Sequence, residues 1–244
     1  MGGAGPLHLY YADRRCLADD LVATLVTAAD RERSAALTHP RRRAEFLAGR
    51  ALLRYALEQF TGRSAHSHEL RATPEGKPEC VAGPAISLSH SGDILVCAVA
   101  SGDAIGVDVE TRRLRTSAAT VAAQYFSPVE ASWIEADPDR RFQMLWVLKE
   151  AYLKALGVGL AGGLSSLECR IEPPSIKARV GAGAAAPNLA LYSGRGCYLG
   201  VAWLGEPRRA ISVSSWLRPG AEDALGPFDR IAATARVSSP PPFP

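Results

Sequence analysis

The spacing of hydrophobic positions changes along the chain and predicts an alternation of helices and strands. Between residues 41 and 60, large apolar residues recur every three or four positions with arginines between them, which is typical of an amphipathic helix. Short apolar runs at 85–89 and 94–100 flank a His-Ser-Gly-Asp turn, and a third run follows at 104–110. Short apolar runs joined by tight turns indicate an antiparallel meander.

The second half of the chain repeats this order of helices followed by strands. Residues 118–126 and 140–156 have helical spacing, and Gly157 ends the second of these helices. Between them, Ser127 and Glu130 have the spacing of a capping box. Further apolar runs predict strands at 167–171, 189–192 and 198–204, with a weaker one at 211–216.

Length and element order together predict two lobes. A chain of 244 residues falls between one and two ordinary domains. Because each half runs from helices to strands, we expect an α+β fold of two similar lobes related by a pseudo-twofold axis, each a small, mostly antiparallel sheet packed with helices. The expected division is an N-terminal lobe at residues 1–103, a C-terminal lobe at 104–217 and a weakly ordered tail at 218–244.

Composition excludes several classes of protein. The net charge of +3 is too small to indicate a nucleic-acid-binding protein by itself. The longest apolar run, at 94–100, is far shorter than the ~20 residues of a membrane span, and residues 1–16 lack the apolar core of a signal peptide. The five cysteines include no CxxC pair, so we expect neither a zinc ribbon nor a disulfide framework. We therefore expect a cytoplasmic protein with no nucleic-acid or membrane partner.

Two acidic side chains in the Gly-Val-Asp-Val-Glu segment at 106–110 could hold a cation. Alternate side chains of a strand share a face, so Asp108 and Glu110 stand together, about 7 Å apart at their Cα atoms. Two such carboxylates can converge on one hard cation. A solvated acidic face of an ordinary strand would give the same pattern.

A second chemical pattern lies on the predicted helix at 140–156. Trp146, Glu150 and Lys154 are spaced four residues apart and therefore share one stripe of the helix. An ordinary surface ion pair between Glu150 and Lys154 explains this spacing equally well.

Polar and basic clusters in the first half could bind an anion. Lys77 lies in a rigid Gly-Lys-Pro segment, and Ser89, His90 and Ser91 offer hydrogen-bond donors at a strand end, although a polar turn would give the same pattern. The first predicted long helix also carries a basic face that suits either phosphate or plain solvent. Its members are Arg41, Arg42, Arg43, Arg50 and Arg54.

The order of these clusters is more specific than any one of them. Gly-Lys-Pro, Ser-x-Ser-His-Ser, Gly-x-Asp-x-Glu and Trp-x-x-Lys-Glu-x-x-x-Lys follow one another between residues 41 and 159. In this order they resemble the 4′-phosphopantetheinyl transferase superfamily, in particular its two-domain, surfactin-synthetase-activating type. Two positions depart from the family pattern: Ser87 stands where Asn or Asp is frequent, and Val147 where many members have Ser or Thr.

The resemblance implies an activity and roles for the residues. Family members transfer the 4′-phosphopantetheine arm of coenzyme A to a serine of an apo carrier protein and release 3′,5′-ADP. By resemblance, Asp108, Glu110 and Glu150 hold Mg²⁺, Glu150 also acts as the base, and Lys154 stabilises the leaving phosphate. The resemblance implies coenzyme A contacts at Lys77, Ser89 and His90, and less directly at Arg43 and Arg50. Glu130 matches an acidic position near the metal in some members, with the capping box as its alternative role.

The implied partners are coenzyme A and acyl or peptidyl carrier-protein domains. We expect the protein to be a monomer that acts in secondary metabolism. Coenzyme A is expected to lie between the two lobes, and the carrier protein to dock near residues 124–133. Two other functions stay open. A metal-dependent phosphodiesterase or nuclease also uses grouped carboxylates with a lysine, and a non-catalytic domain could bind coenzyme A or a carrier protein without turnover.

Overall fold

The first lobe is a four-stranded sheet with the strand order β11-β1-β5-β4. Its strands are β1 (Leu7–Asp13), β4 (Ala85–Ser91), β5 (Ile94–Ala100) and β11 (Ile211–Ser215). The computed structural model describes residues 5–102, 104–111, 118–181, 184, 186–194, 196–205, 210–216 and 228–234. β5 pairs antiparallel with both β1 and β4, as the tight turn between β4 and β5 predicts.

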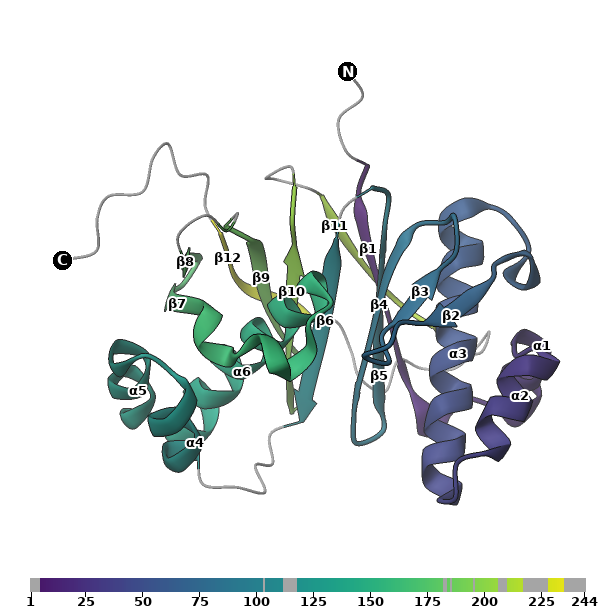
Figure 1. Ribbon diagram of the computed structural model, residues 1–244, viewed down its shortest axis with the longest axis horizontal. Coiled ribbons are helices and arrows are strands. Elements are labelled where there is room, and N and C mark those ends of the chain that lie inside the picture. The colour runs from purple at the N-terminus through teal and green to yellow at the C-terminus, as the bar shows by residue number, and fades with distance from the viewer. Residues whose placement is uncertain are drawn as a thin grey trace.

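The long helix α3 (Pro40–Thr61) covers the outer face of this sheet, and α1 (Asp19–Leu25) and α2 (Ala28–Ala35) pack against α3 (Figure 1). α3 starts where the His39 side chain accepts the Arg41 N–H and Pro40 occupies the first turn, and it ends at Gly62 in the left-handed conformation. Leu52, Leu53 and neighbouring small residues of α3 are buried against β5.

The second lobe is a six-stranded sheet with the order β6-β10-β9-β12-β8-β7. Its strands are β6 (Ile105–Thr111), β7 (Leu167–Glu172), β8 (Ser175–Val180), β9 (Asn188–Gly194), β10 (Cys197–Trp203) and β12 (Asp229–Thr234). Its helices are α4 (Ala118–Tyr125), α5 (Pro128–Glu135) and α6 (Pro138–Leu156). Short 3-10 turns lie at Arg14–Cys16, Ala65–Ser67, Gly159–Gly162 and Leu164–Ser166.

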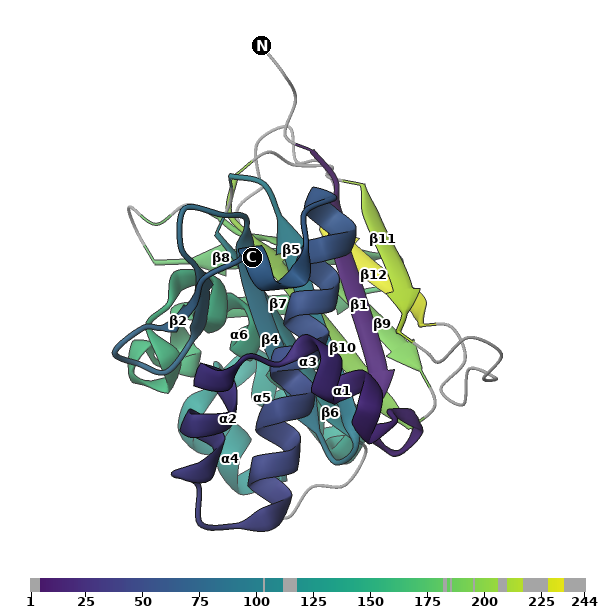
Figure 2. The ribbon, with the colours of Figure 1, turned by 90° about the vertical axis from the view of Figure 1, so that its right-hand side faces the viewer.

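The two lobes share a strand order, which confirms the predicted α+β architecture. In the first lobe, β1 precedes α3 and the order is β1-β5-β4; in the second, β6 precedes α6 and the order is β6-β10-β9. The sheet faces turned away from α3 and α6 pack together in one core, which includes Leu9, Val96, Val107 and Leu199. The layers therefore run helix, sheet, sheet, helix, with α6 and α3 on opposite sides of the sheets in Figure 1 and with α3 facing the viewer in Figure 2.

The backbone of helix α6 packs directly against two glycines of its sheet. A Cβ at Gly106 of β6 would come within 1.9 Å of the Ala151 carbonyl oxygen. A Cβ at Gly200 of β10 would come within 2.3 Å of the Val147 oxygen. Only glycine permits this approach, so the glycine of the Gly-x-Asp-x-Glu pattern seats the helix that carries Glu150 and Lys154.

Some elements differ from the sequence expectations. Residues 71–83, expected as loop, contain the hairpin strands β2 (Leu70–Ala72) and β3 (Pro78–Cys80). β11 lies in the first sheet, parallel to β1, although its residues fall in the range expected for the second lobe. β12 belongs to the second sheet and falls in the expected tail, whose other residues, 218–227 and 235–244, lie outside the described residues. The division at residue 103 stays a prediction.

None of the helices that the structure describes is both long enough and apolar enough to cross a membrane.

Candidate functional site

The candidate site lies where β4 of the first lobe meets β6 and α6 of the second. A cavity of about 300 Å³ is lined there by Ser89 and His90 from β4, Asp108 and Glu110 from β6, and Trp146, Glu150 and Lys154 from α6. The structure therefore brings together residues of three separate motifs. The alternation predicted for β6 holds, because Val107 and Val109 are fully buried in the core while Asp108 and Glu110 face the cavity.

Asp108 and Lys154 form the charged centre of this cavity. The Lys154 ammonium lies 2.7 Å from Asp108 Oδ1 and donates to Ser89 Oγ at 2.9 Å. Ser89 Oγ in turn donates to Asp108 Oδ1 at 2.8 Å. The second carboxylate oxygen, Asp108 Oδ2, is buried without a hydrogen-bond partner. A buried carboxylate oxygen without a partner is costly, so this atom points to a bound ligand.

Glu150 has the chemistry expected of a proton acceptor. Burial, reinforced by the negative charge of Asp108, raises the pKa of Glu150 to about 7 despite the opposing charge of Lys154. Burial also raises the pKa of Glu110, although the hydrogen bond from Ser91 opposes this shift. A carboxylate with a pKa near neutrality can both take and return a proton at physiological pH. Three carboxylates that share a cavity also favour any cation placed among them.

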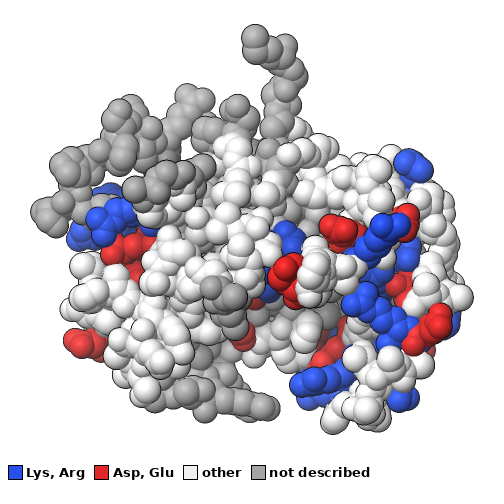
Figure 3. Space-filling view, in the orientation of Figure 1, with Lys and Arg blue, Asp and Glu red and all other residues white. Residues whose placement is uncertain are grey.

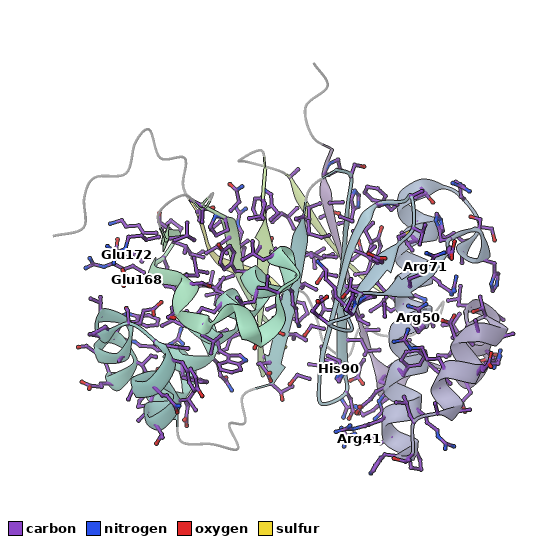
Figure 4. All side chains as sticks on the ribbon, viewed as in Figure 1. Arg41, Arg50, Arg71, His90, Glu168 and Glu172 are labelled. Atoms are coloured by element: carbon purple, nitrogen blue, oxygen red, sulfur yellow. The ribbon has the colours of Figure 1, made fainter. Side chains whose placement is uncertain are left out.

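A basic pocket adjoins the cavity on the side of the first lobe. It has a volume of about 410 Å³, and His90 and Leu88 line both spaces. Its basic lining residues are Arg33, Arg42, Arg50 and Arg71. Figure 3 shows Lys and Arg side chains gathered over this lobe, and Figure 4 shows Arg50, Arg71 and His90 within it. Such a set of guanidinium groups suits a phosphate.

The two arginines proposed from the sequence have different surroundings. Arg50 lines the basic pocket, but its Nε donates to Asp30 at 2.6 Å and its Nη2 donates to the Leu70 carbonyl at 3.1 Å. Arg43 is absent from the residues that line the pocket, and its guanidinium donates to the carbonyls of Leu37 and Ala35.

Sequence reasoning did not single out Arg33 or Arg71, and it named Arg42 only as one member of the basic face. The pocket forms where α2 and the β2–β3 hairpin pack beside α3. The sequence alone therefore could not show that Arg42 of α3 faces it. Asp30 holds this arrangement together, because it accepts hydrogen bonds from both Arg50 and Arg54. Burial opposes the charge of Asp30, but hydrogen bonds from Thr27 and Arg50 outweigh burial and lower its pKa to about 2.

The Lys77 side chain forms hydrogen bonds with backbone carbonyl groups of the second lobe. Its ammonium donates to the Lys154 carbonyl at 2.6 Å and to the Ile105 carbonyl at 3.2 Å. Burial, together with the charge of Lys154, lowers the pKa of Lys77. Lys77 also lines a further cavity with Glu150 and Lys154, so it borders the site while joining the β2–β3 hairpin to α6.

Glu130 lies in the core of the second lobe. Its side chain is 1% exposed, and it completes the capping box with Ser127 at the start of α5. Its Oε1 accepts the Cys169 N–H at 2.8 Å and lies 2.9 Å from the Lys149 ammonium. Glu130 is absent from the lining of the cavity that contains Asp108, so its capping role is the one the structure shows.

Two family models match the chain. Residues 30–100 match the 4′-phosphopantetheinyl transferase N-terminal domain, and residues 104–189 match the 4′-phosphopantetheinyl transferase superfamily. The chain is 32% identical over 163 residues to the 4′-phosphopantetheinyl transferase HetI of Nostoc sp., covering 63% of this chain and 68% of HetI. It is 32% identical over 170 residues to a 4′-phosphopantetheinyl transferase of Bacillus subtilis, covering 66% and 75%.

The chain therefore belongs to the 4′-phosphopantetheinyl transferase superfamily. Within it, the chain is of the Sfp-like type. It is 34% identical over 90 residues to the 4′-phosphopantetheinyl transferase Sfp of Bacillus subtilis strain 168. These aligned residues cover 35% of this chain and 39% of Sfp.

Proposed function

We propose that the chain transfers the 4′-phosphopantetheine arm of coenzyme A to a serine of an apo carrier protein and releases 3′,5′-ADP. The observation that carries the proposal is the cavity between the lobes, which Glu150 lines together with the Asp108–Lys154 pair. Membership of the superfamily supports the same reaction.

Coenzyme A would span the two adjoining spaces. The basic pocket suits the 3′-phosphate end, and the cavity beside Lys154 suits the diphosphate, with His90 at the boundary between them. Ser89, His90 and Lys77 are the proposed contacts from the first lobe, together with Arg50 in the basic pocket. Arg43 would need to release its bonds to the Leu37 and Ala35 carbonyls to contribute.

Mg²⁺ fits the donor set of the cavity. Among the described residues, no three or more His, Cys, Asp or Glu side chains are already gathered closely enough to form a metal site by themselves. Mg²⁺ is usually bound through one or two carboxylates together with substrate phosphates and water, so a complete protein cage is not required. The unpartnered Asp108 Oδ2 is one suitable oxygen. We propose that Asp108, Glu110 and Glu150 hold Mg²⁺, which would neutralise charge on the diphosphate.

The residues of the cavity would divide the chemistry between them. The serine oxygen bonds to the phosphorus that carries the pantetheine arm, and the bond from this phosphorus to the bridging oxygen of the diphosphate breaks. Glu150 takes the serine proton, and the Lys154 ammonium offsets the charge that develops on the leaving 3′,5′-ADP. Phosphoryl transfer depends mainly on such positioning and charge stabilisation.

The carrier partner, the monomeric state, a cytoplasmic location and a role in secondary metabolism are proposals that rest on the resemblance. Tyr125 and Val129, which are 46% and 61% exposed, lie within the segment 124–133 that we propose for carrier docking. The nuclease and non-catalytic alternatives lose support, because the chain belongs to a transferase superfamily and keeps the acidic positions and the lysine of its motifs.

Intact-mass spectrometry tests the proposal. A purified apo carrier protein is incubated with this protein, coenzyme A and Mg²⁺, with EDTA added in a parallel reaction. We expect a mass gain of one phosphopantetheine that EDTA abolishes. No gain on fatty-acid, polyketide or peptidyl carriers, despite bound coenzyme A, would contradict the proposed transfer.

A further inference from the structure

Two edge strands of separate sheets, β4 and β6, meet at the site, and serine side chains join them. The Oγ atoms of three alternate residues of β4 accept backbone N–H groups of β6 at 3.1 to 3.4 Å. The pairs are Ser87 with Val107, Ser89 with Val109, and Ser91 with Thr111. The exposed N–H groups of an edge strand need partners, and here hydroxyl groups of the other lobe supply them.

Two of these serines also bind a carboxylate of the site. Ser89 donates to Asp108 Oδ1 at 2.8 Å, and Ser91 donates to Glu110 Oε2 at 2.8 Å. The residue in the corresponding position opposite Ser87 is Gly106, which has no side chain. Ser87 therefore makes the same bond to β6 as Ser91 but, among the described residues, has no hydrogen bond to a carboxylate.

The bond to the β6 backbone restricts the directions in which each hydroxyl proton can point. A serine hydroxyl has one proton to donate and two lone pairs that accept. Because Ser91 Oγ accepts the Thr111 N–H at 3.1 Å, its proton is free to point to Glu110. The Thr111 hydroxyl, 3.3 Å away, can then occupy the second lone pair of Ser91. The carboxylate of Glu110 is thus tied to the β4 strand through Oε2.

We propose that Ser91 is a positioning residue, which holds Glu110 Oε2 so that Glu110 Oε1 is presented to the divalent cation of the site. This inference rests on the proposed transferase function. Ser91 is not among the residues that line the cavity, whereas Ser89 lines it and also contacts Lys154. Ser91 therefore isolates the positioning effect from direct contact with substrate.

Groups that orient a metal-binding carboxylate typically change metal affinity by about 10–100-fold when they are removed. We expect Ser91→Ala to raise the Mg²⁺ concentration for half-maximal transfer at least about 10-fold, with the KM for coenzyme A nearly unchanged. Ser87→Ala is the matched control, because it removes a bond to the β6 backbone without releasing a carboxylate. Ser91→Thr, which keeps the hydroxyl, should restore the wild-type requirement.

A binding measurement provides a readout independent of transfer. Mn²⁺ is titrated into each protein with coenzyme A present and no carrier, and free Mn²⁺ is followed by electron paramagnetic resonance. Weaker Mn²⁺ binding by Ser91→Ala than by Ser87→Ala supports the proposal, whereas equal shifts in both variants, or none, overturn it. Thermal unfolding of both alanine variants checks that they fold, and Ser91→Cys, a weak donor of similar volume, replaces Ser91→Ala if it does not.

The two proposals fail in different ways. Wild-type protein that binds Mn²⁺ with coenzyme A but modifies no carrier contradicts the transferase function, and the titration of the variants still decides the role of Ser91. Wild-type protein that transfers the arm without binding Mn²⁺ overturns the role of Ser91 and leaves the transfer reaction standing.

Discussion

Glu150 shows how a single partly buried carboxyl group can connect the proposed catalysis with stability. Its pKa of about 7 suits a base, but the shift also means that the charged form is disfavoured in the folded protein. The folded-state pKa lies above the ordinary value of 4.5. The stability that this shift contributes is therefore present below pH 4.5 and is lost as the pH rises through about 7.

We expect Glu150→Gln, which stays neutral, to be more stable than wild type at pH 8 and to have lost transfer activity. Because Glu150 is only partly buried, solvent screening limits the expected gain to the order of 1–2 kcal/mol. Urea unfolding at pH 5 and pH 8 without divalent cations measures the difference. Equal stability of the two proteins at pH 8 would show that the Glu150 charge is not disfavoured by its surroundings.

The pKa of Asp30 is shifted in the opposite direction from that of Glu150. Hydrogen bonds from Thr27 and Arg50 outweigh the effect of burial, and its pKa of about 2 lies below the ordinary 3.8. Its contribution to stability is therefore present above pH 3.8 and lost as the pH falls through about 2. We expect wild type to lose about 2 kcal/mol more than Asp30→Asn between pH 4 and pH 2. Urea unfolding at several pH values between 4 and 2 measures this difference. An equal fall in the free energy of unfolding of the two proteins would contradict the expectation.

At the scale of elements, the seating of α6 on β6 and β10 decides the geometry of the site. Glu150 and Lys154 project from α6 toward Asp108 and Glu110 on β6, so a displacement of the helix separates the two halves of the site. The helix is seated by the two glycines that face it, Gly106 and Gly200, since any side chain there would collide with its backbone.

Gly106→Ala tests this seating. A Cβ only 1.9 Å from the Ala151 oxygen forces α6 outward, so we expect a loss of stability of about 1–3 kcal/mol or more together with a fall in transfer rate. Gly181→Ala is the control, because nothing lies within 4 Å of its Cβ position and no positive φ is present there. Circular dichroism melts and transfer rates measure both variants, and equal behaviour of the two would count against the seating of α6.

At the scale of the whole molecule, side chains of the first lobe join the edge of β6. The β6 groups that face the first lobe include the N–H groups of Val107, Val109 and Thr111, which bond to β4 serines. The Ile105 carbonyl accepts a bond from Lys77. Ser89 and Lys77 therefore border the site and also join the lobes, so we expect ligand binding to stabilise the contact between the lobes.

Lys77→Met removes the bonds to the Ile105 and Lys154 carbonyls while keeping most of the side-chain volume. We expect the free energy of unfolding to fall by about 1–3 kcal/mol even without coenzyme A, since charge-assisted hydrogen bonds are lost. Lys77→Arg retains a charged donor and serves as the control. Unchanged unfolding of Lys77→Met, combined with a raised KM for coenzyme A, would instead assign Lys77 to substrate binding alone.

Patterns within short segments of the sequence were sufficient for a large part of this protein. Strand alternation placed Val107 in the core and Asp108 in the site, and helical spacing located α3 and α6, because both periodicities depend only on near neighbours. The short strands β2 and β3 were missed because each has only three residues, too few to show a period. The order of the motifs indicated the superfamily.

Contacts between distant segments needed the tertiary structure. β11 pairs with β1 through residues such as Leu7 and Ile211, which lie at opposite ends of the chain. The same holds for the bonds from Lys77 to the Lys154 carbonyl and from Ser91 to Glu110, because no local pattern specifies which carbonyl or carboxylate a side chain meets. Local patterning therefore supplied the chemical groups of the site, and the packing of the two lobes decided which of them face one another.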